Sequence, residues 1–150
     1  MPLEVFPVTT DEQQQHAFAI RRTVFIMEKK FDAELQFDEY DALPNTHHFL
    51  GRDTETGKIV ATARCVVFAD ERKGKIGRVA VLPESRGKRY GAAIMAALES
   101  ALHEQCDKFV LSAVFDKCAF YEKCGYERMN DETYLEMDVE HCMMVKNVNV

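Results

Sequence analysis

A short apolar strand that leads into a basic, glycine-containing loop and then a long helix is the feature that most limits this fold. Residues 79–82, Val-Ala-Val-Leu, form an unbroken apolar run, which Pro83 ends. Such a run, without polar alternation, is typical of a central strand covered on both faces. The helix predicted over 91–105 is rich in alanine and repeats apolar residues every three or four positions. The unit therefore predicts a sheet with helices packed against it.

The rest of the chain adds strands on both sides of this unit. Alternation, β-branched residues and turn residues predict strands over 3–8, 47–52, 58–68, 75–82, 109–115, 134–138 and 142–145. Thr10 and Gln13 form a capping box that begins a helix ending near residue 30. A short helix is expected over 116–124, and the acidic stretch 31–45 is expected to be a loop with one helical turn. The order predicts a mixed α/β (α+β) fold around one sheet.

Composition limits the protein to a few classes. The chain has 150 residues, enough for one domain over 1–150, with 47% hydrophobic and 29% charged residues. Its net charge of −6 is unfavourable for a nucleic acid or an anionic membrane surface. The N-terminus lacks the basic region of a signal peptide, and no apolar run approaches the ~20 residues of a membrane helix. We therefore expect a soluble, cytoplasmic protein.

The cysteine and histidine pattern gives no support to a metal site. Five cysteines are present, and none forms a Cys-x-x-Cys pair. The adjacent pairs His47-His48 and His141-Cys142 would point to opposite faces of a strand. The sequence therefore predicts free thiols in a reducing compartment and no bound metal.

The loop between the apolar strand and the long helix has the chemistry of an anion site. Unpaired N–H groups at a helix start, together with the helix dipole, attract phosphate. The loop gathers positive charge and small residues on an otherwise acidic chain: Arg86, Gly87, Lys88, Arg89, Tyr90 and Gly91. It lacks the Gly-Lys-Ser/Thr of nucleotide kinases and the three glycines of dinucleotide-binding folds. A plain turn before a helix is the alternative for this loop taken alone.

A second motif, Phe-Tyr-Glu-Lys-Cys-Gly-Tyr over 120–126, follows the next strand. Alone, its aromatic residues would be read as core packing. Together, the loop and this motif resemble the GNAT superfamily of acyl-CoA-dependent N-acyltransferases, whose coenzyme loop is Arg/Gln-x-x-Gly-x-Gly/Ala. Residues 22–28 and 37–41 are similar to its small, single-domain YjcF-like branch. Arg89 stands where that family most often has its middle glycine.

The resemblance implies a GNAT fold with one mixed, mostly antiparallel central sheet flanked by helices. It implies acetyl-CoA as co-substrate, with no metal, held by the loop residues 86–91. The strand would pair with the pantetheine arm and supply an oxyanion donor, a role that falls collectively on Val79, Ala80 and Val81. The strands around Val81 and Val110 would splay to admit the arm. Tyr121 matches the general acid that protonates the departing thiolate.

The base and the acceptor remain open at this level. An amine must lose a proton when it attacks, and the candidate bases are Asp38, Glu39, Asp41, His48 and His141. Glu39 is preferred because it lies in the acidic loop expected to face the acceptor, and His141 comes second. The acidic stretch 32–41 would attract a cationic amine. For a sugar phosphate, residues 21–22, 29–30 and Arg64 offer basic side chains whose convergence the sequence does not reveal.

These inferences predict N-acetylation of a primary amine of a small molecule by direct attack in a ternary complex. The alternatives are an amino-sugar acetyltransferase such as one for glucosamine 6-phosphate, a protein lysine or N-terminal acetyltransferase, and a non-catalytic acyl-CoA-binding module. The glucosamine-6-phosphate enzymes share the Phe-Tyr-Glu-Lys-Cys-Gly run, which belongs to the coenzyme side. The oligomeric state is open: residues 145–150 could add a strand to a partner and form a homodimer, or fray.

Overall fold

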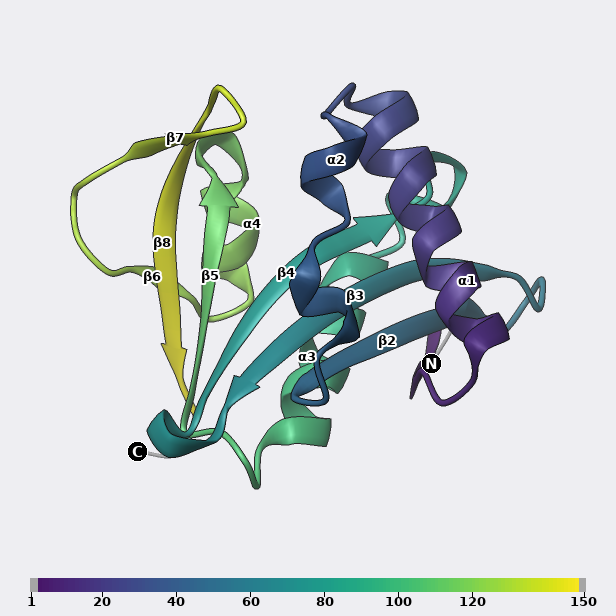
Figure 1. Ribbon diagram of the computed structural model, residues 1–150, viewed down its shortest axis with the longest axis horizontal. Coiled ribbons are helices and arrows are strands. Elements are labelled where there is room, and N and C mark those ends of the chain that lie inside the picture. Colours follow the sequence, from purple (N-terminus) through teal and green to yellow (C-terminus); the bar gives the residue numbers. More distant parts are fainter. Residues whose placement is uncertain (1–2, 149–150) are drawn as a thin grey trace.

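The sheet is built from strands that differ greatly in length. A computed structural model describes residues 3–148, and within them eight strands form one sheet (Figure 1). The strands are β1 (Leu3–Pro7), β2 (Thr46–Asp53), β3 (Ile59–Phe68), β4 (Lys73–Val81), β5 (Lys108–Val114), β6 (Glu127–Arg128), β7 (Tyr134–Glu136) and β8 (Val139–Asn147). Their order is β1-β2-β3-β4-β5-β8-β6, and β7 also pairs with β8.

Every strand pair but one is antiparallel. β4 and β5 run parallel, and the helix α3 (Tyr90–Leu102) connects them. The other pairs are hairpins or antiparallel returns, including β8, which lies between β5 and β6. The expected fold class, a mixed and mostly antiparallel sheet flanked by helices, is confirmed.

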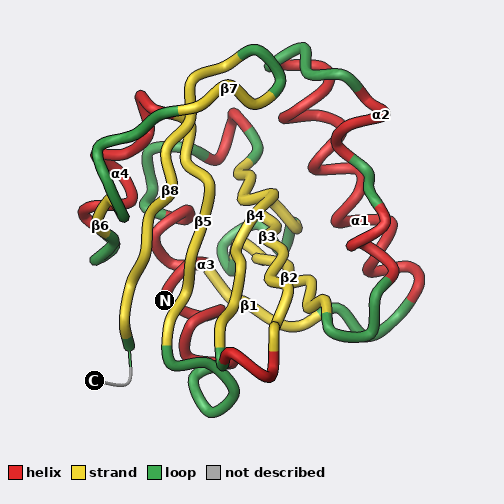
Figure 2. The backbone as a smooth tube through the Cα atoms, turned by 60° about the vertical axis from the view of Figure 1, so that its left-hand side comes forward, coloured by secondary structure: helices red, strands yellow, loops and turns green. Residues whose placement is uncertain are grey.

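Helices cover both faces of the sheet. On one face lie α1 (Asp11–Arg21), the π-helical segment Arg22–Glu28 that continues it, and the short helix α2 (Ala33–Gln36). α3 lies behind the sheet in Figure 1, and α4 (Cys118–Lys123) lies on the far side of the strands from α1 in Figure 2. Two apolar clusters result. The larger packs α3 against the sheet, and the smaller joins α1 to the sheet through Leu50 and Ala80.

Local signals set the starts of these elements. Thr10 Oγ1 accepts from the N–H of Gln13, whose side chain accepts from the N–H of Thr10, so the predicted capping box begins α1. The predicted helix is α-helical only to Arg21, because the next turn is wider and Lys29 donates to the carbonyl of Val24.

The acidic stretch is more ordered than a loop. It holds α2 and a 3₁₀ turn, Glu39–Ala42, which Asp38 caps. Of the tail 145–150, residues up to Asn147 pair within β8, and residues 149–150 lie outside the described part. The helices described between residues 3 and 148 are too short or too polar to cross a membrane.

Candidate active site

The parallel strands β4 and β5 separate along their length. They pair from Lys73↔Lys108 to Ile76↔Leu111, and no pairing follows beyond that point. In Figure 1 the two strands diverge from their paired ends into a V. The separation begins at Gly77, where a Cβ atom would meet nothing within 4 Å. The predicted splay is present at Val81, whereas Val110 lies in the paired part, opposite Lys75. The separation exposes one edge of β4.

A bulge in β4 determines which backbone groups face this opening. Thr62 of β3 pairs with Ala80 and Arg64 pairs with Gly77, so β4 carries one extra residue. The bulge includes Arg78, whose backbone has a left-handed φ of 54°. The N–H of Leu82 donates to Val60 of β3 at 2.9 Å. Because backbone groups alternate between the two edges of a strand, Ala80 also faces β3, whereas Val79 and Val81 face the opening.

The loop before α3 leaves backbone donors free at the start of that helix. Within the described chain, the N–H groups of residues 87–91 donate to no acceptor. Gly87 has φ 82°, and a Cβ there would meet nothing within 4 Å. Arg89 is the residue before α3 and has φ 63°, a conformation that favours glycine. The left-handed φ explains why the GNAT proteins that this loop resembles most often have glycine at the position of Arg89. The unpaired N–H groups of the loop can donate to an anionic phosphate.

Two basic side chains of the loop, Arg86 and Lys88, each lie close to a carboxylate. Arg86 donates through Nη1 and Nη2 to the carboxylate of Glu28 at 2.6 and 2.7 Å, and through Nε to the carbonyl of Val81 at 3.0 Å. The Arg86 hydrogen bond lowers the pKa of Glu28. Lys88 lies 3.7 Å from the buried Asp53. A bound phosphate would have to compete with these carboxylates.

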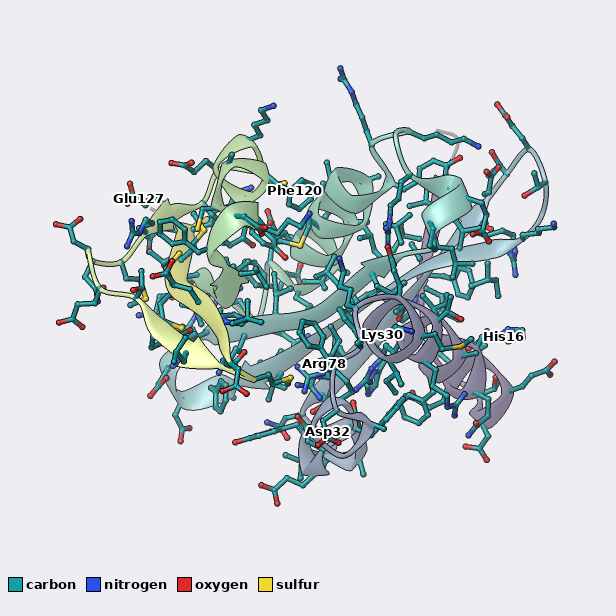
Figure 3. All side chains as sticks on the ribbon, turned by 90° about the horizontal axis from the view of Figure 1, so that it is seen from above. His16, Lys30, Asp32, Arg78, Phe120 and Glu127 are labelled. Atoms are coloured by element: carbon teal, nitrogen blue, oxygen red, sulfur yellow. The ribbon has the colours of Figure 1, made fainter. Side chains whose placement is uncertain are left out.

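The two sequence motifs meet through direct packing. A Cβ atom on Gly91 would lie 3.1 Å from Cζ of Phe120, so the first turn of α3 packs tightly against that ring, and a side chain there would require the ring to shift by a few tenths of an ångström. In Figure 3 Phe120 lies between α4 and α3. The Phe120 ring in turn contacts Tyr121, with centroids 5.0 Å apart. The loop thereby fixes the position of α4, which carries Tyr121.

Tyr121 lines the same cavity as Val79 and Val81. Its ring packs on Tyr126, and its hydroxyl has no hydrogen-bond partner among the side chains and backbone groups that the structure describes. Burial, with smaller effects of Cys124 and Cys118, raises the pKa of Tyr121 to about 12. The hydroxyl is therefore a protonated donor at every physiological pH.

His141 lies on β8 with Nδ1 held by the backbone and Nε2 near a carboxylate. Nδ1 lies 2.7 Å from the carbonyl of Val139, so this nitrogen carries the proton and Nε2 is left as the acceptor. Nε2 lies 3.4 Å from the carboxylate of Glu136, and the ring stacks on Tyr134. A base held by one carbonyl and flanked by a carboxylate can take up a proton and be stabilised as an imidazolium ion.

An arginine–aspartate cluster lies beside the site, where Asp38, Arg64 and Arg78 line the cavity. Arg21, which is 1% exposed, holds the carboxylate of Asp41 with two hydrogen bonds of 2.7 and 3.0 Å. Arg64 donates to Asp38 and Asp41, and Arg78 donates to Asp38. Burial raises the pKa of Asp41, but Arg21 and Arg64 outweigh it and the net pKa is lowered. Three guanidinium groups face two carboxylates, a formal charge of +1.

This cluster changes the electrostatic expectation for the acidic stretch. Two of its carboxylates, Asp38 and Asp41, are neutralised, so the stretch is not a simple trap for cations. Of the basic side chains considered for a sugar phosphate, Lys29 and Arg64 line one cavity, whereas Arg22 and Lys30 do not. Arg21 is buried and paired with Asp41. Figure 3 shows Arg78 on the side of the sheet toward the segment that carries Asp32. Arg78 was not among the predicted site residues; its charge directly before the apolar run 79–82 was the available signal.

One cavity of about 1010 Å³ brings most of the predicted residues together. It is lined by Val79, Ala80, Val81, Arg86, Gly87, Arg89, Tyr90, Gly91, Tyr121 and His141. Ala80 is buried with its backbone paired to β3, and Lys88 turns toward Asp53 instead. Glu39 is exposed in the 3₁₀ turn, outside the residues that line this cavity. In the part of the chain that the structure describes, no three metal-ligating side chains cluster.

Contact between α2 and the β7–β8 hairpin closes one side of the cavity. The side-chain amide of Gln36 lies 3.2 Å from the sulfur of Met137 at the hairpin turn. Both residues line the cavity, so the acceptor side is bridged rather than open along its length.

Comparison with known proteins identifies the family. The sequence pattern of the Acetyltransferase (GNAT) family matches residues 14–126. The chain is 31% identical to the uncharacterized N-acetyltransferase YjcF of Bacillus subtilis strain 168, covering 91% of this chain and 94% of YjcF. It is 27% identical to the glucosamine 6-phosphate N-acetyltransferase of Candida albicans, covering 78% and 82% of the two chains.

A solved structure gives the same answer at the level of the fold. The acyl-CoA N-acyltransferase from Pseudomonas aeruginosa superposes with a TM-score of 0.79 at 28% identity, covering 96% of this chain and 99% of that one. The open edge of β4, the loop before α3 and the motif around Tyr121 occur together in a single cavity. The chain therefore belongs to the acetyltransferase (GNAT) family, enzymes that use acetyl-CoA as co-substrate.

Proposed function

We propose that the protein transfers the acetyl group of acetyl-CoA to a primary amine of a small molecule, by direct attack in a ternary complex. The observation that carries this proposal is the meeting of the open β4 edge, Tyr121 and His141 in one cavity. The amine nitrogen bonds to the thioester carbonyl carbon, and the carbon–sulfur bond breaks. One proton leaves the amine, and the thiolate gains a hydrogen-bond donor.

The backbone of β4 binds and polarises the thioester. Val79 and Val81 direct their amide groups toward the opening, whereas Ala80 is paired with β3. These two residues therefore carry the role first assigned to all three, pairing with the extended pantetheine arm and donating to the carbonyl oxygen as negative charge develops. The free N–H groups of residues 87–91 hold the pyrophosphate.

Tyr121 acts as the hydrogen-bond donor and His141 as the proton acceptor of the reaction. The Tyr121 hydroxyl donates to the departing sulfur, and His141 Nε2 accepts the amine proton directly or through water. Glu136 then stabilises the imidazolium ion across 3.4 Å. We prefer His141 to Glu39 as the base because His141 lines the cavity, whereas Glu39 faces solvent.

The cavity wall favours an acceptor that carries an anionic group beside its amine. The arginine–aspartate cluster has a formal charge of +1, and both Arg64 and Arg78 line the cavity. An amino-sugar phosphate such as glucosamine 6-phosphate, the substrate in the name of the Candida albicans relative, satisfies this requirement. The bridge between Gln36 and Met137 favours such small acceptors over a protein lysine.

An amine panel monitored by coenzyme A thiol release tests this function. The sharpest comparison is a matched pair, glucosamine 6-phosphate against glucosamine, with spermidine and a lysine peptide as the other classes. We expect faster thiol release with the phosphorylated member of the pair, and release roughly 10- to 150-fold slower with the Tyr121→Phe variant. Acetyl-CoA binding in calorimetry without thiol release from any amine would instead support a binding module. The cytoplasm, where free thiols are stable, is the proposed location.

A further inference from the structure

Two of the five cysteines meet beside the active site. Sγ of Cys118, at the start of α4, lies 2.8 Å from Sγ of Cys142 in β8. This separation is far below ordinary contact between unbonded sulfur atoms and within 1 Å of the ~2.05 Å disulfide bond. The thiols are 24 positions apart along the chain, so the contact depends on the packing of α4 against the sheet. No comparable sulfur contact is seen for Cys124 among the described residues.

We propose that Cys118 and Cys142 are a modification site that forms a reversible intramolecular disulfide with a hydroperoxide as oxidant. Cys118 is partly exposed and is the thiol that an oxidant reaches, whereas Cys142 is fully buried. The Cys118 thiolate attacks the peroxide oxygen, which breaks the O–O bond, gives a sulfenic acid and releases an alcohol or water. Cys142 then displaces water from that sulfur. In total, two thiols lose two electrons and two protons to the peroxide.

The surroundings of the pair set its rate. Burial, reinforced by the neighbouring Cys142, raises the pKa of Cys118 to about 11. The thiolate is the reactive form, so oxidation is slow at pH 7 and rises about tenfold per pH unit well below that pKa. The titratable groups near Cys118 are Cys142, Glu122, Arg128 and Tyr121. Cys142 and Glu122 raise the pKa of Cys118, and Arg128 lowers it. A slow, peroxide-dependent disulfide is compatible with a reducing compartment.

The disulfide would link α4 and β8, the two elements that carry the proposed catalytic residues Tyr121 and His141. Cys118 lies one turn before Tyr121 on α4, and Cys142 follows His141 on β8. Oxidation would therefore fix α4 to β8 across the acetyl-transfer site. The proposal itself concerns only the sulfur pair and does not depend on which amine the enzyme acetylates.

Thiol counting and peptide mapping on the full chain test the proposal. The reduced protein is treated with hydrogen peroxide at pH 7, 8 and 9 and is then denatured in the presence of an alkylating agent, which blocks the remaining thiols. Intact mass and digestion under non-reducing conditions follow. We expect two of the five thiols to disappear together, a mass loss of about 2 Da before alkylation, and one cross-linked peptide pair. Dithiothreitol should restore all five thiols, and the rate should rise with pH.

Matched serine variants separate this pair from nonspecific oxidation. Cys118→Ser and Cys142→Ser should each abolish the cross-linked peptide, whereas Cys124→Ser should retain it. Cys118→Ser changes a partly exposed residue, so it remains informative if the buried Cys142→Ser variant does not fold. Irreversible mass gains of oxygen on single cysteines without a cross-link, or loss of two thiols in Cys118→Ser at the wild-type rate, would overturn the proposal.

Discussion

Replacing Tyr121 with phenylalanine removes one hydroxyl from the proposed site and nothing else. With a pKa of about 12 for Tyr121 and about 8.5 for a free thiol, complete proton transfer to the departing sulfur would be uphill by roughly 3.5 units. At 1.36 kcal/mol per unit, this amounts to about 5 kcal/mol. The hydroxyl therefore acts by donating a hydrogen bond that strengthens as charge develops. A hydrogen bond to a charged group is worth about 1.5–3 kcal/mol, so we expect kcat to fall roughly 10- to 150-fold.

The same variant should leave the fold intact. The hydroxyl has no partner in the free protein, so the free energy of unfolding should change by less than about 0.5 kcal/mol. Tyr126→Phe is the matched control, because the Tyr126 hydroxyl donates to the buried carboxylate of Glu99 at 2.8 Å. Its loss should cost about 1–3 kcal/mol of stability while kcat is retained.

Steady-state kinetics with thiol detection, together with urea unfolding, measures both effects. The Michaelis constant for acetyl-CoA should change little in Tyr121→Phe, and the wild-type kcat should show no fall from Tyr121 ionisation below about pH 11. A Tyr121→Phe enzyme with the wild-type kcat would refute the proposed role. So would a Tyr126→Phe enzyme that loses kcat to the same extent.

Four further substitutions probe the loop and the cluster. Arg89→Gly should raise the free energy of unfolding by about 0.5–1 kcal/mol, because relief of the left-handed φ exceeds the entropy cost of glycine; an equal or lower value in urea unfolding would contradict this. Glu28→Gln should tighten coenzyme A binding by up to about fivefold by freeing Arg86, whereas Arg86→Gln should weaken it. Calorimetry that shows no difference between the two would oppose this role. Asp41→Asn leaves Arg21 without its carboxylate and should cost about 3–5 kcal/mol. Because the pKa of Asp41 is lowered, its stabilisation is present above about pH 4 and is lost as the pH falls further, so the variant should show a shallower acid slope.

Local sequence signals predicted much of the coenzyme half of the site. The apolar run ended by Pro83, the glycines and basic residues of the loop, and the aromatic motif each act over a few residues, and the structure brings them together as expected. The bulge at Arg78 was not predicted, because it depends on one extra residue in β4 relative to β3. The placement of Glu39 outside the cavity likewise follows from the 3₁₀ turn within the acidic stretch.

The sequence by itself determined the family and the strand–loop–helix unit, and it singled out Tyr121 within the second motif. Periodicity, turn residues and motif spacing are local properties, so a single sequence reveals them. Only the tertiary structure decided the acceptor side. The insertion of β8 beside β5 places His141 in the cavity, and packing across 20 to 40 positions neutralises Asp38 and Asp41 with three arginines. The same packing joins Cys118 to Cys142. Such contacts depend on strand order and register, which side-chain patterns along a single segment do not specify.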